Sequence, residues 1–323
     1  MSLIGHIWTI GDLMRRDRLH IELPSIPWRG TVEDSSLGKL QLSGWVDHPT
    51  GASEAKCAVV ILHGLGGSAD SGYAREAAQV ALAAGFPALR FSLRGADRSG
   101  EDYFHAGLTD DLHAALASPE LASFEEVLVM GFSLGGHVAL TAATEPQLDA
   151  RVRAVIAVSA PLDLASCCQV IDRPSRWPYR QYMLRNLFEI YGEVAKRREV
   201  PVPLSELRQV RQLRDFDHLV VAPRFGFESA MDYYDRASVG PRLIELRVPV
   251  LYVGSLNDPM VPVHCVEPYT ELSELLQVCW TRAGGHVAFS GALDLGQPGE
   301  LGVYAQTLSW AGQHLTSGSV FTT

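Results

Sequence analysis

The sequence has no long run of apolar residues and no start typical of a secreted protein. Residues 1–10 lack both the positively charged beginning and the continuous apolar core of a signal peptide. No later run reaches the roughly 20 apolar residues that a membrane-spanning helix needs. We therefore expect a cytoplasmic protein and no membrane association.

Cysteine and positive charge are also scarce. The five cysteines are odd in number and include no Cys-x-x-Cys pair, so we expect neither a disulfide framework nor a thiolate zinc site. The adjacent Cys167 and Cys168 are interpreted as buried reduced thiols rather than a redox pair. With 27 Lys and Arg against 37 Asp and Glu, the net charge is -10, whereas binding a phosphate backbone requires a positive field. Nucleic acid is not an expected partner.

What the sequence does contain is a regular alternation of strand and helix patterns. Its 323 residues are 47% hydrophobic, enough for one large α/β domain with an insertion. Continuous apolar runs predict buried strands at 55–62, 88–93, 126–132, 152–158, 248–254 and 276–280. Helical spacing falls at 71–84, 108–117, 134–144 and 303–314, and 30–46 is typical of two edge strands. This order predicts a mostly parallel central sheet flanked by helices.

Two segments fall outside the alternation. Residues 1–30 are interpreted as a polar lead-in whose prolines end any regular element, and we assign no chemistry to them. Residues 162–243 have no buried strand run but several helical stretches rich in arginine and aromatic residues. We interpret them as a helical cap inserted into a core formed by 30–161 and 244–323.

The strongest motif is Gly-x-Ser-x-Gly at residues 131–135, between a predicted strand and a predicted helix. In so sharp a reversal the positions two before and two after the apex crowd together, which favours glycine at 131 and 135. Ser133 then lies at the apex with a strained backbone and an exposed hydroxyl. An ordinary serine in a glycine-rich loop is the alternative, and the flanking strand and helix favour the nucleophile elbow.

A serine nucleophile needs an imidazole base and an anion that orients it. Asp258 follows the strand at 248–254, and His286 follows Gly284 and Gly285 after the last strand. With Ser133 they occur in the chain order Ser, Asp, His that this type of fold uses. Asp163 remains an alternative acid, and His264 and His314 remain alternative bases.

The reaction also builds an oxyanion, which must meet preorganised donors. We predict that the backbone N–H groups of Leu65 and Leu134 supply them. His63, next to Leu65, is interpreted as structural, and His137 is expected to face the pocket wall or the interior.

The chain resembles the YheT-like α/β-hydrolases, whose eukaryotic relatives are membrane-associated acylglycerol and phospholipid lipases. Besides the elbow, the resemblance rests on five strings: residues 63–65 with the glycines that follow, 91–95, 103–111, 216–217, and 226–234 followed by Ala237 and Ser238. It implies a serine hydrolase of carboxylic esters with the triad Ser133, Asp258 and His286. His137 departs from the asparagine that is common in the family.

Together these observations predict a carboxylesterase, of esterase or lipase type, that acts on a small-molecule acyl ester and needs no metal or organic cofactor. Thioester hydrolysis or acyl transfer on the same triad is the alternative within enzymes. A non-catalytic binding protein with this fold is the alternative from another class. Dehalogenase and epoxide hydrolase chemistry would need an aspartate at position 133.

Overall fold

The computed structural model describes residues 3–16, 21–50 and 55–316 and contains one eight-stranded sheet in the order β1-β2-β4-β3-β5-β6-β7-β8. The strands are β1 (Ser25–Asp34), β2 (Gly38–Asp47), β3 (Cys57–Leu62), β4 (Ala88–Ser92), β5 (Glu126–Phe132), β6 (Val152–Val158), β7 (Val250–Ser255) and β8 (Leu276–Thr281). Only the pairings of β1 with β2 and of β2 with β4 are antiparallel. The predicted mostly parallel sheet is confirmed.

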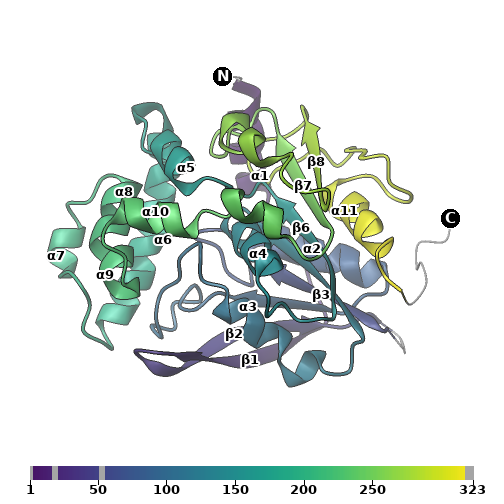
Figure 1. Ribbon diagram of the computed structural model, residues 1–323, viewed down its shortest axis with the longest axis horizontal. Helices are drawn as coiled ribbons and strands as arrows, with labels where there is room; N and C mark the ends of the chain where they lie inside the picture. The colour runs from purple at the N-terminus through teal and green to yellow at the C-terminus, as the bar shows by residue number, and fades with distance from the viewer. Residues whose placement is uncertain (1–2, 17–20, 51–54, 317–323) are drawn as a thin grey trace.

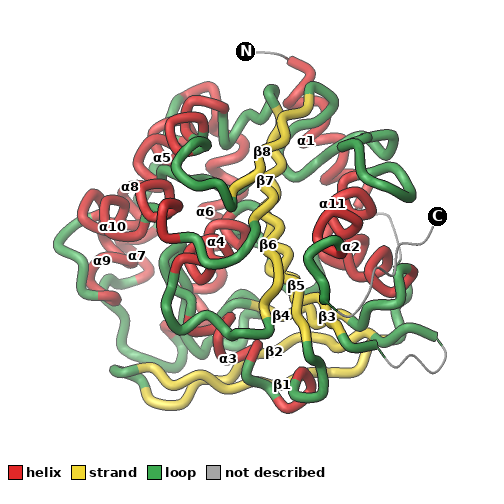
Figure 2. Tube along the Cα trace, turned by 45° about the vertical axis from the view of Figure 1, so that its right-hand side comes forward, coloured by secondary structure: helices red, strands yellow, loops and turns green. Residues whose placement is uncertain are grey.

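The central strands of this sheet are buried throughout because helices cover both of its faces. Figure 2 shows α2 (Gly72–Ala83) and α11 (Val303–Gly312) on one face, and α3 (Asp110–Leu116) and α4 (Leu134–Thr144) on the other. Each face has its own cluster of buried apolar side chains. Short 3-10 turns occur at Pro119–Leu121, Pro174–Arg176, Gly240–Glu245, Val263–Cys265 and Glu267–Tyr269.

The helices between β6 and β7, which we interpret as the cap, gather beside α4 (Figure 1). They are α5 (Leu164–Ile171), α6 (Trp177–Ala195), α7 (Leu204–Leu207), α8 (Leu213–Phe216), α9 (Ala222–Phe225) and α10 (Ala230–Ala237). A π-helical turn at Asp217–Val221 joins α8 to α9. Within the described ranges, no helix is both long and apolar enough to cross a bilayer.

The amino-terminal segment differs from the sequence-based expectation. It forms helix α1 (Leu3–Arg16), and β1 begins at Ser25, so the segment is not free of regular structure. Pro27 is tolerated within β1 because this is an edge strand. A Cβ atom at Gly5 would lie 1.7 Å from the carbonyl oxygen of Asn257, so α1 packs tightly on the loop after β7.

A buried arginine joins the loop after β4 to two other parts of the core. Arg94 is 1% exposed, and its Nε and backbone N–H donate to the two carboxylate oxygens of the fully buried Asp111 at 2.9 and 2.8 Å. Its Nη1 donates to Asp34 at the end of β1 at 2.9 Å. Removing this guanidinium leaves the Asp111 carboxylate buried without its cation.

Arg94→Met should therefore lower the free energy of unfolding by about 3–5 kcal/mol, the usual cost of leaving one member of a buried ion pair alone. Urea unfolding measures it. Arg185→Met is the matched control, because Arg185 is 82% exposed in its pair with Glu189 and should lose less than about 1 kcal/mol. Equal losses for the two variants would contradict the structural role of Arg94.

Candidate active site

Ser133 lies in a one-residue turn between β5 and α4. Its backbone has φ 51° and ψ -119°, a conformation that is costly for a residue with a side chain. A Cβ atom at Gly131 would lie 2.3 Å from the carbonyl oxygen of Gly135, and one at Gly135 would lie 2.3 Å from that of His63. Both glycines are therefore needed for the turn that presents Ser133.

The loops after β7 and β8 bring Asp258 and His286 to this serine. His286 Nε2 lies 2.9 Å from Ser133 Oγ, and His286 Nδ1 lies 2.9 and 3.2 Å from the two carboxylate oxygens of Asp258. The nearly buried Asp258 is held by the backbone N–H groups of Met260 and Val261, which donate to its Oδ1 at 2.8 and 2.9 Å. The three side chains proposed from the sequence thus form one continuous chain of hydrogen bonds.

The alternative residues have other surroundings. Asp163 caps helix α5, where its carboxylate accepts a hydrogen bond from the backbone N–H of Ser166 at 2.8 Å. His264 lies in a 3-10 turn, and the ring of His314 packs on Trp310 with 4.6 Å between centroids. In the part of the chain that the structure describes, none of the three hydrogen-bonds to Ser133.

The residues proposed for the oxyanion site lie next to the serine. Leu65 and Leu134 line the same pocket as Ser133. Leu134 is the first residue of α4, where backbone N–H groups have no acceptor within the helix. Among the described residues, neither the Leu65 nor the Leu134 amide donates a hydrogen bond to the chain. Neither N–H group is therefore occupied by another part of the described chain.

Two nearby histidines are buried and bonded to the backbone. His63 Nδ1 lies 2.7 Å from the carbonyl oxygen of Gly64, its Nε2 accepts from the Leu93 N–H at 3.0 Å, and burial lowers its pKa to about 4. His137 Nδ1 and Nε2 lie 2.7 and 2.8 Å from the carbonyl oxygens of Pro161 and Ala237. Burial also lowers the pKa of His137. His137 faces the interior and ties the elbow helix to the cap.

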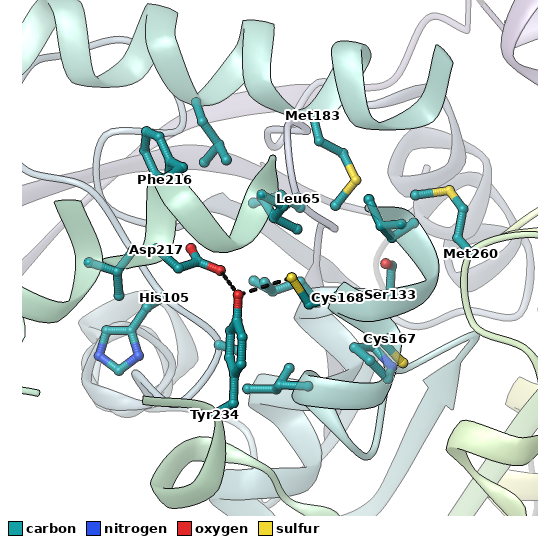
Figure 3. A pocket seen from close by; sticks show the side chains of 18 of the residues that line it. Leu65, His105, Ser133, Cys167, Cys168, Met183, Phe216, Asp217, Tyr234 and Met260 are labelled. Carbon is teal, nitrogen blue, oxygen red and sulfur yellow. Dashed lines mark hydrogen bonds between the residues drawn. The ribbon is translucent and has the colours of Figure 1, made fainter. Parts of the chain in front are cut away.

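Two hollows meet at Ser133. The inner hollow, under the cap, contains roughly 730 Å³ of space that protein atoms do not occupy, part of it open to solvent, and its wall is mostly apolar (Figure 3). The outer hollow lies between the loop at 64–73, α1 and α6. Ser133, His286, Leu65, Met183 and Met260 line both. An ester bound at the serine hydroxyl could therefore place its acyl part in one hollow and its alcohol part in the other.

Helix α1 contributes a contact to the catalytic loop that sequence reasoning missed. The backbone N–H of His286 donates to Thr9 Oγ1 at 2.8 Å, and Thr9 Oγ1 in turn donates to the carbonyl oxygen of Gly5 at 2.8 Å. A Cβ atom at Gly285 would lie 2.4 Å from Thr9 Oγ1, so the glycine before His286 allows this approach. Thr9 holds the backbone of the candidate base.

Thr9→Val keeps the shape of the side chain but leaves the His286 N–H without its acceptor, which costs about 1–3 kcal/mol. We expect kcat/KM for a short ester to fall about tenfold as His286 loses its fixed position. Thr9→Ser, which keeps the hydroxyl, should stay near wild type. Equal activity of the valine variant and wild type would show that α1 does not position the base.

A polar cluster in the inner hollow was likewise not assigned a role from the sequence. The Tyr234 hydroxyl lies 2.5 Å from Asp217 Oδ2 and 3.0 Å from Cys168 Sγ (Figure 3). Burial raises the pKa of Asp217 to about 7, the Tyr234 hydrogen bond opposes this rise, and the Asp172 charge adds to it. Burial also raises the pKa of Tyr234 and Cys168, so both keep their protons at neutral pH.

This shift predicts a pH dependence of stability. Because the pKa of Asp217 rises from 3.8 to about 7 on folding, the folded state binds more protons than the unfolded chain between these values. The contribution of Asp217 to the free energy of unfolding is complete below pH 3.8 and is lost as pH rises through 7. The loss is about 1 kcal/mol per pH unit between these two values. The difference in melting temperature, Asp217→Asn minus wild type, should therefore become more positive as pH rises from 5 to 8. Parallel melting curves would contradict the shift.

With this geometry in place, the comparisons with known proteins define the class. A model of the alpha/beta hydrolase fold family matches residues 58–292, and the chain belongs to this family. Within it the chain is similar to YheT. The Escherichia coli (strain K12) protein YheT, named as an esterase, is 29% identical over 76% of this chain and 74% of its own length.

Other relatives and solved structures agree with this placement. Monoacylglycerol lipase of Saccharomyces cerevisiae is 28% identical over 84% of this chain but only 64% of its own length. Human phospholipase ABHD3 is 23% identical over 82% of this chain and 68% of its own. A solved esterase of Pyrococcus furiosus has a TM-score of 0.54 and 20% identity over 87% of this chain and 88% of its own, which supports the fold alone.

Proposed function

We propose that this α/β hydrolase cleaves carboxylic esters, with Ser133 as nucleophile, His286 as general base and acid, and Asp258 as the anion that orients His286. The observation that carries the proposal is the hydrogen-bond chain from Ser133 Oγ through His286 to Asp258, at the junction of two hollows. The names of the relatives, esterase, monoacylglycerol lipase and phospholipase, support ester hydrolysis in general.

Acylation begins when Ser133 Oγ forms a bond to the ester carbonyl carbon and passes its proton to His286 Nε2. The carbonyl electron pair moves to oxygen, and the Leu65 and Leu134 N–H groups hold the resulting oxyanion. Its collapse breaks the bond to the alkoxide, which takes the proton from His286 and leaves as the alcohol. Asp258 stays ionised throughout and stabilises the imidazolium.

Deacylation repeats these steps with water. His286 takes a proton from water, the hydroxide adds to the acyl carbon, and Ser133 leaves with the proton that His286 returns. No step requires a metal or an organic cofactor. The cytoplasmic location expected from the sequence remains a prediction.

The two hollows suggest how an ester binds. We place the acyl chain in the inner, largely apolar hollow and the alcohol in the outer one. Each methylene buried against an apolar wall contributes up to about 0.8 kcal/mol. Consequently kcat/KM should rise with acyl length until the inner hollow is filled and then fall.

The test is a product assay on purified protein with esters of one alcohol and increasing acyl length. Hydrolysis predicts that acid and alcohol appear in equal amounts. A deficit of acid when a competing alcohol or thiol is added would indicate acyl transfer instead. Release no faster than the spontaneous rate for every ester and thioester would favour a binding protein over an enzyme.

A further inference from the structure

The apolar wall of the inner hollow is interrupted by one carboxyl group. Asp217 is 9% exposed and lines this hollow at the first residue of the π-helical turn between α8 and α9. Such turns are uncommon and occur often at functional sites. Figure 3 shows Asp217, Tyr234 and His105 on the side of the pocket away from Ser133 and Met260.

The bonding capacity of this carboxyl group is only partly used. Its Oδ2 lies 2.5 Å from the Tyr234 hydroxyl, and among the described residues its Oδ1 has no hydrogen-bond partner. Within the described ranges, the one charged group that shifts the pKa of Asp217 is another carboxylate, Asp172, and no cation contributes to the shift. Because Asp217 lines the hollow, a ligand group that donates to Oδ1 would add a hydrogen bond without displacing one that the described chain makes.

Resting on the proposed ester hydrolysis, we infer that the inner hollow takes acyl chains that carry a hydroxyl group and that Asp217 selects that hydroxyl. The methylenes of such a chain would pack on apolar side chains such as Leu65, Met183 and Phe216. The hydroxyl proton would be donated to Asp217 Oδ1. A plain aliphatic chain of the same length would displace water from the carboxyl group and offer no hydrogen bond in return.

A second side chain at this end of the hollow has a polar atom that the described chain does not use. The Gly107 N–H donates to His105 Nδ1 at 3.1 Å, so the neutral His105 ring carries its proton on Nε2. Burial lowers the pKa of His105 to about 3, which keeps the ring neutral. Among the described residues, Nε2 has no hydrogen-bond partner. His105 therefore offers a donor, and Asp217 an acceptor, at the same end of the hollow.

One donor and one acceptor suit a hydroxyl better than an ammonium group. An ammonium presents three N–H donors, and the surrounding leucine, phenylalanine and valine side chains could accept none of them. The Tyr234 hydroxyl donates to Asp217 Oδ2 or to Cys168 Sγ. The other carboxyl oxygen, Asp217 Oδ1, remains as an acceptor for a ligand. The ligand class that fits is thus a neutral hydroxyacyl group.

The test compares esters of one alcohol whose acyl chains match in length and differ by a hydroxyl moved along the chain. At one hydroxyl position, wild type should show a kcat/KM at least about tenfold above that for the plain ester. Asp217→Leu should abolish or reverse this ratio. Asp217→Asn, which keeps an oxygen acceptor, should retain part of it.

Asp215→Leu is the matched control, because Asp215 lies two residues earlier on α8 and does not line the hollow among the described residues. Its hydroxyacyl-to-plain ratio should equal that of wild type. Labelling of Ser133 by a fluorophosphonate probe confirms that each variant keeps a folded site.

Two results would overturn the inference alone: a ratio near one at every hydroxyl position in wild type, or an unchanged ratio in Asp217→Leu. A preference for aminoacyl over hydroxyacyl esters would also overturn it, in favour of a cation site. If wild type hydrolyses none of these esters, plain or hydroxylated, the proposed function fails and the inference fails with it. Normal turnover of plain esters without any hydroxyl preference rejects only the inference.

Discussion

Ser133→Ala should lower kcat/KM for every ester substrate by roughly five orders of magnitude or more. The substitution removes the oxygen that bonds to the acyl carbon and keeps the Cβ atom, so the strained turn at φ 51° is not relaxed as it would be by glycine. Initial rates at high enzyme concentration measure the loss.

The control is Ser36→Ala, an exposed serine in the turn between β1 and β2, which should match wild type. The melting temperature of Ser133→Ala should stay near that of wild type, because alanine keeps the Cβ atom and with it the strained turn. Activity of Ser133→Ala within tenfold of wild type would remove Ser133 from the mechanism.

Asp258→Asn should lower kcat by about 10⁴-fold. The asparagine oxygen can still accept from the Met260 and Val261 N–H groups, so the loop keeps its shape. Its amide, however, donates to His286 Nδ1 instead of accepting from it. The ring then carries its proton on Nε2, toward Ser133, and has no lone pair to take the serine proton.

Asp163→Asn is the matched control, because Asp163 is the other carboxylate that the sequence allowed as the acid. Its amide oxygen can still cap helix α5 by accepting from the Ser166 N–H, and its activity should stay within a few-fold of wild type. A larger loss in Asp163→Asn than in Asp258→Asn would reverse the assignment of the acid. The comparison uses kcat on one ester under saturating conditions.

The fold was largely predictable because its signals are local. Strands buried on both faces are continuous apolar runs, as in Val127–Met130, and each ends at a turn rich in glycine or proline. The crowding at Gly131 and Gly135 follows from the geometry of a one-residue strand-to-helix turn, so the elbow could be predicted from five residues. Asp258 and His286 could be proposed because parallel strands deliver their following loops to one edge of the sheet.

Features that depend on contacts between distant parts of the chain were not predictable. The bond between Thr9 and His286 joins residues 277 positions apart, and nothing in residues 1–30 alone indicates which loop α1 covers. Asp217 was noted only within a family string, since its place in the inner hollow depends on how α5, α8 and α10 pack. Arg94 could be read as a turn residue, and only the structure brings Asp34 and Asp111 to it.

The most direct test of the account is a reaction of the pure protein with a fluorophosphonate probe, with the intact mass as the measurement. An activated Ser133 predicts one adduct on wild type, none on Ser133→Ala, and much slower formation on His286→Ala. No adduct on folded wild type, or an adduct that persists in Ser133→Ala, would contradict the proposal that Ser133 is the nucleophile of an assembled triad.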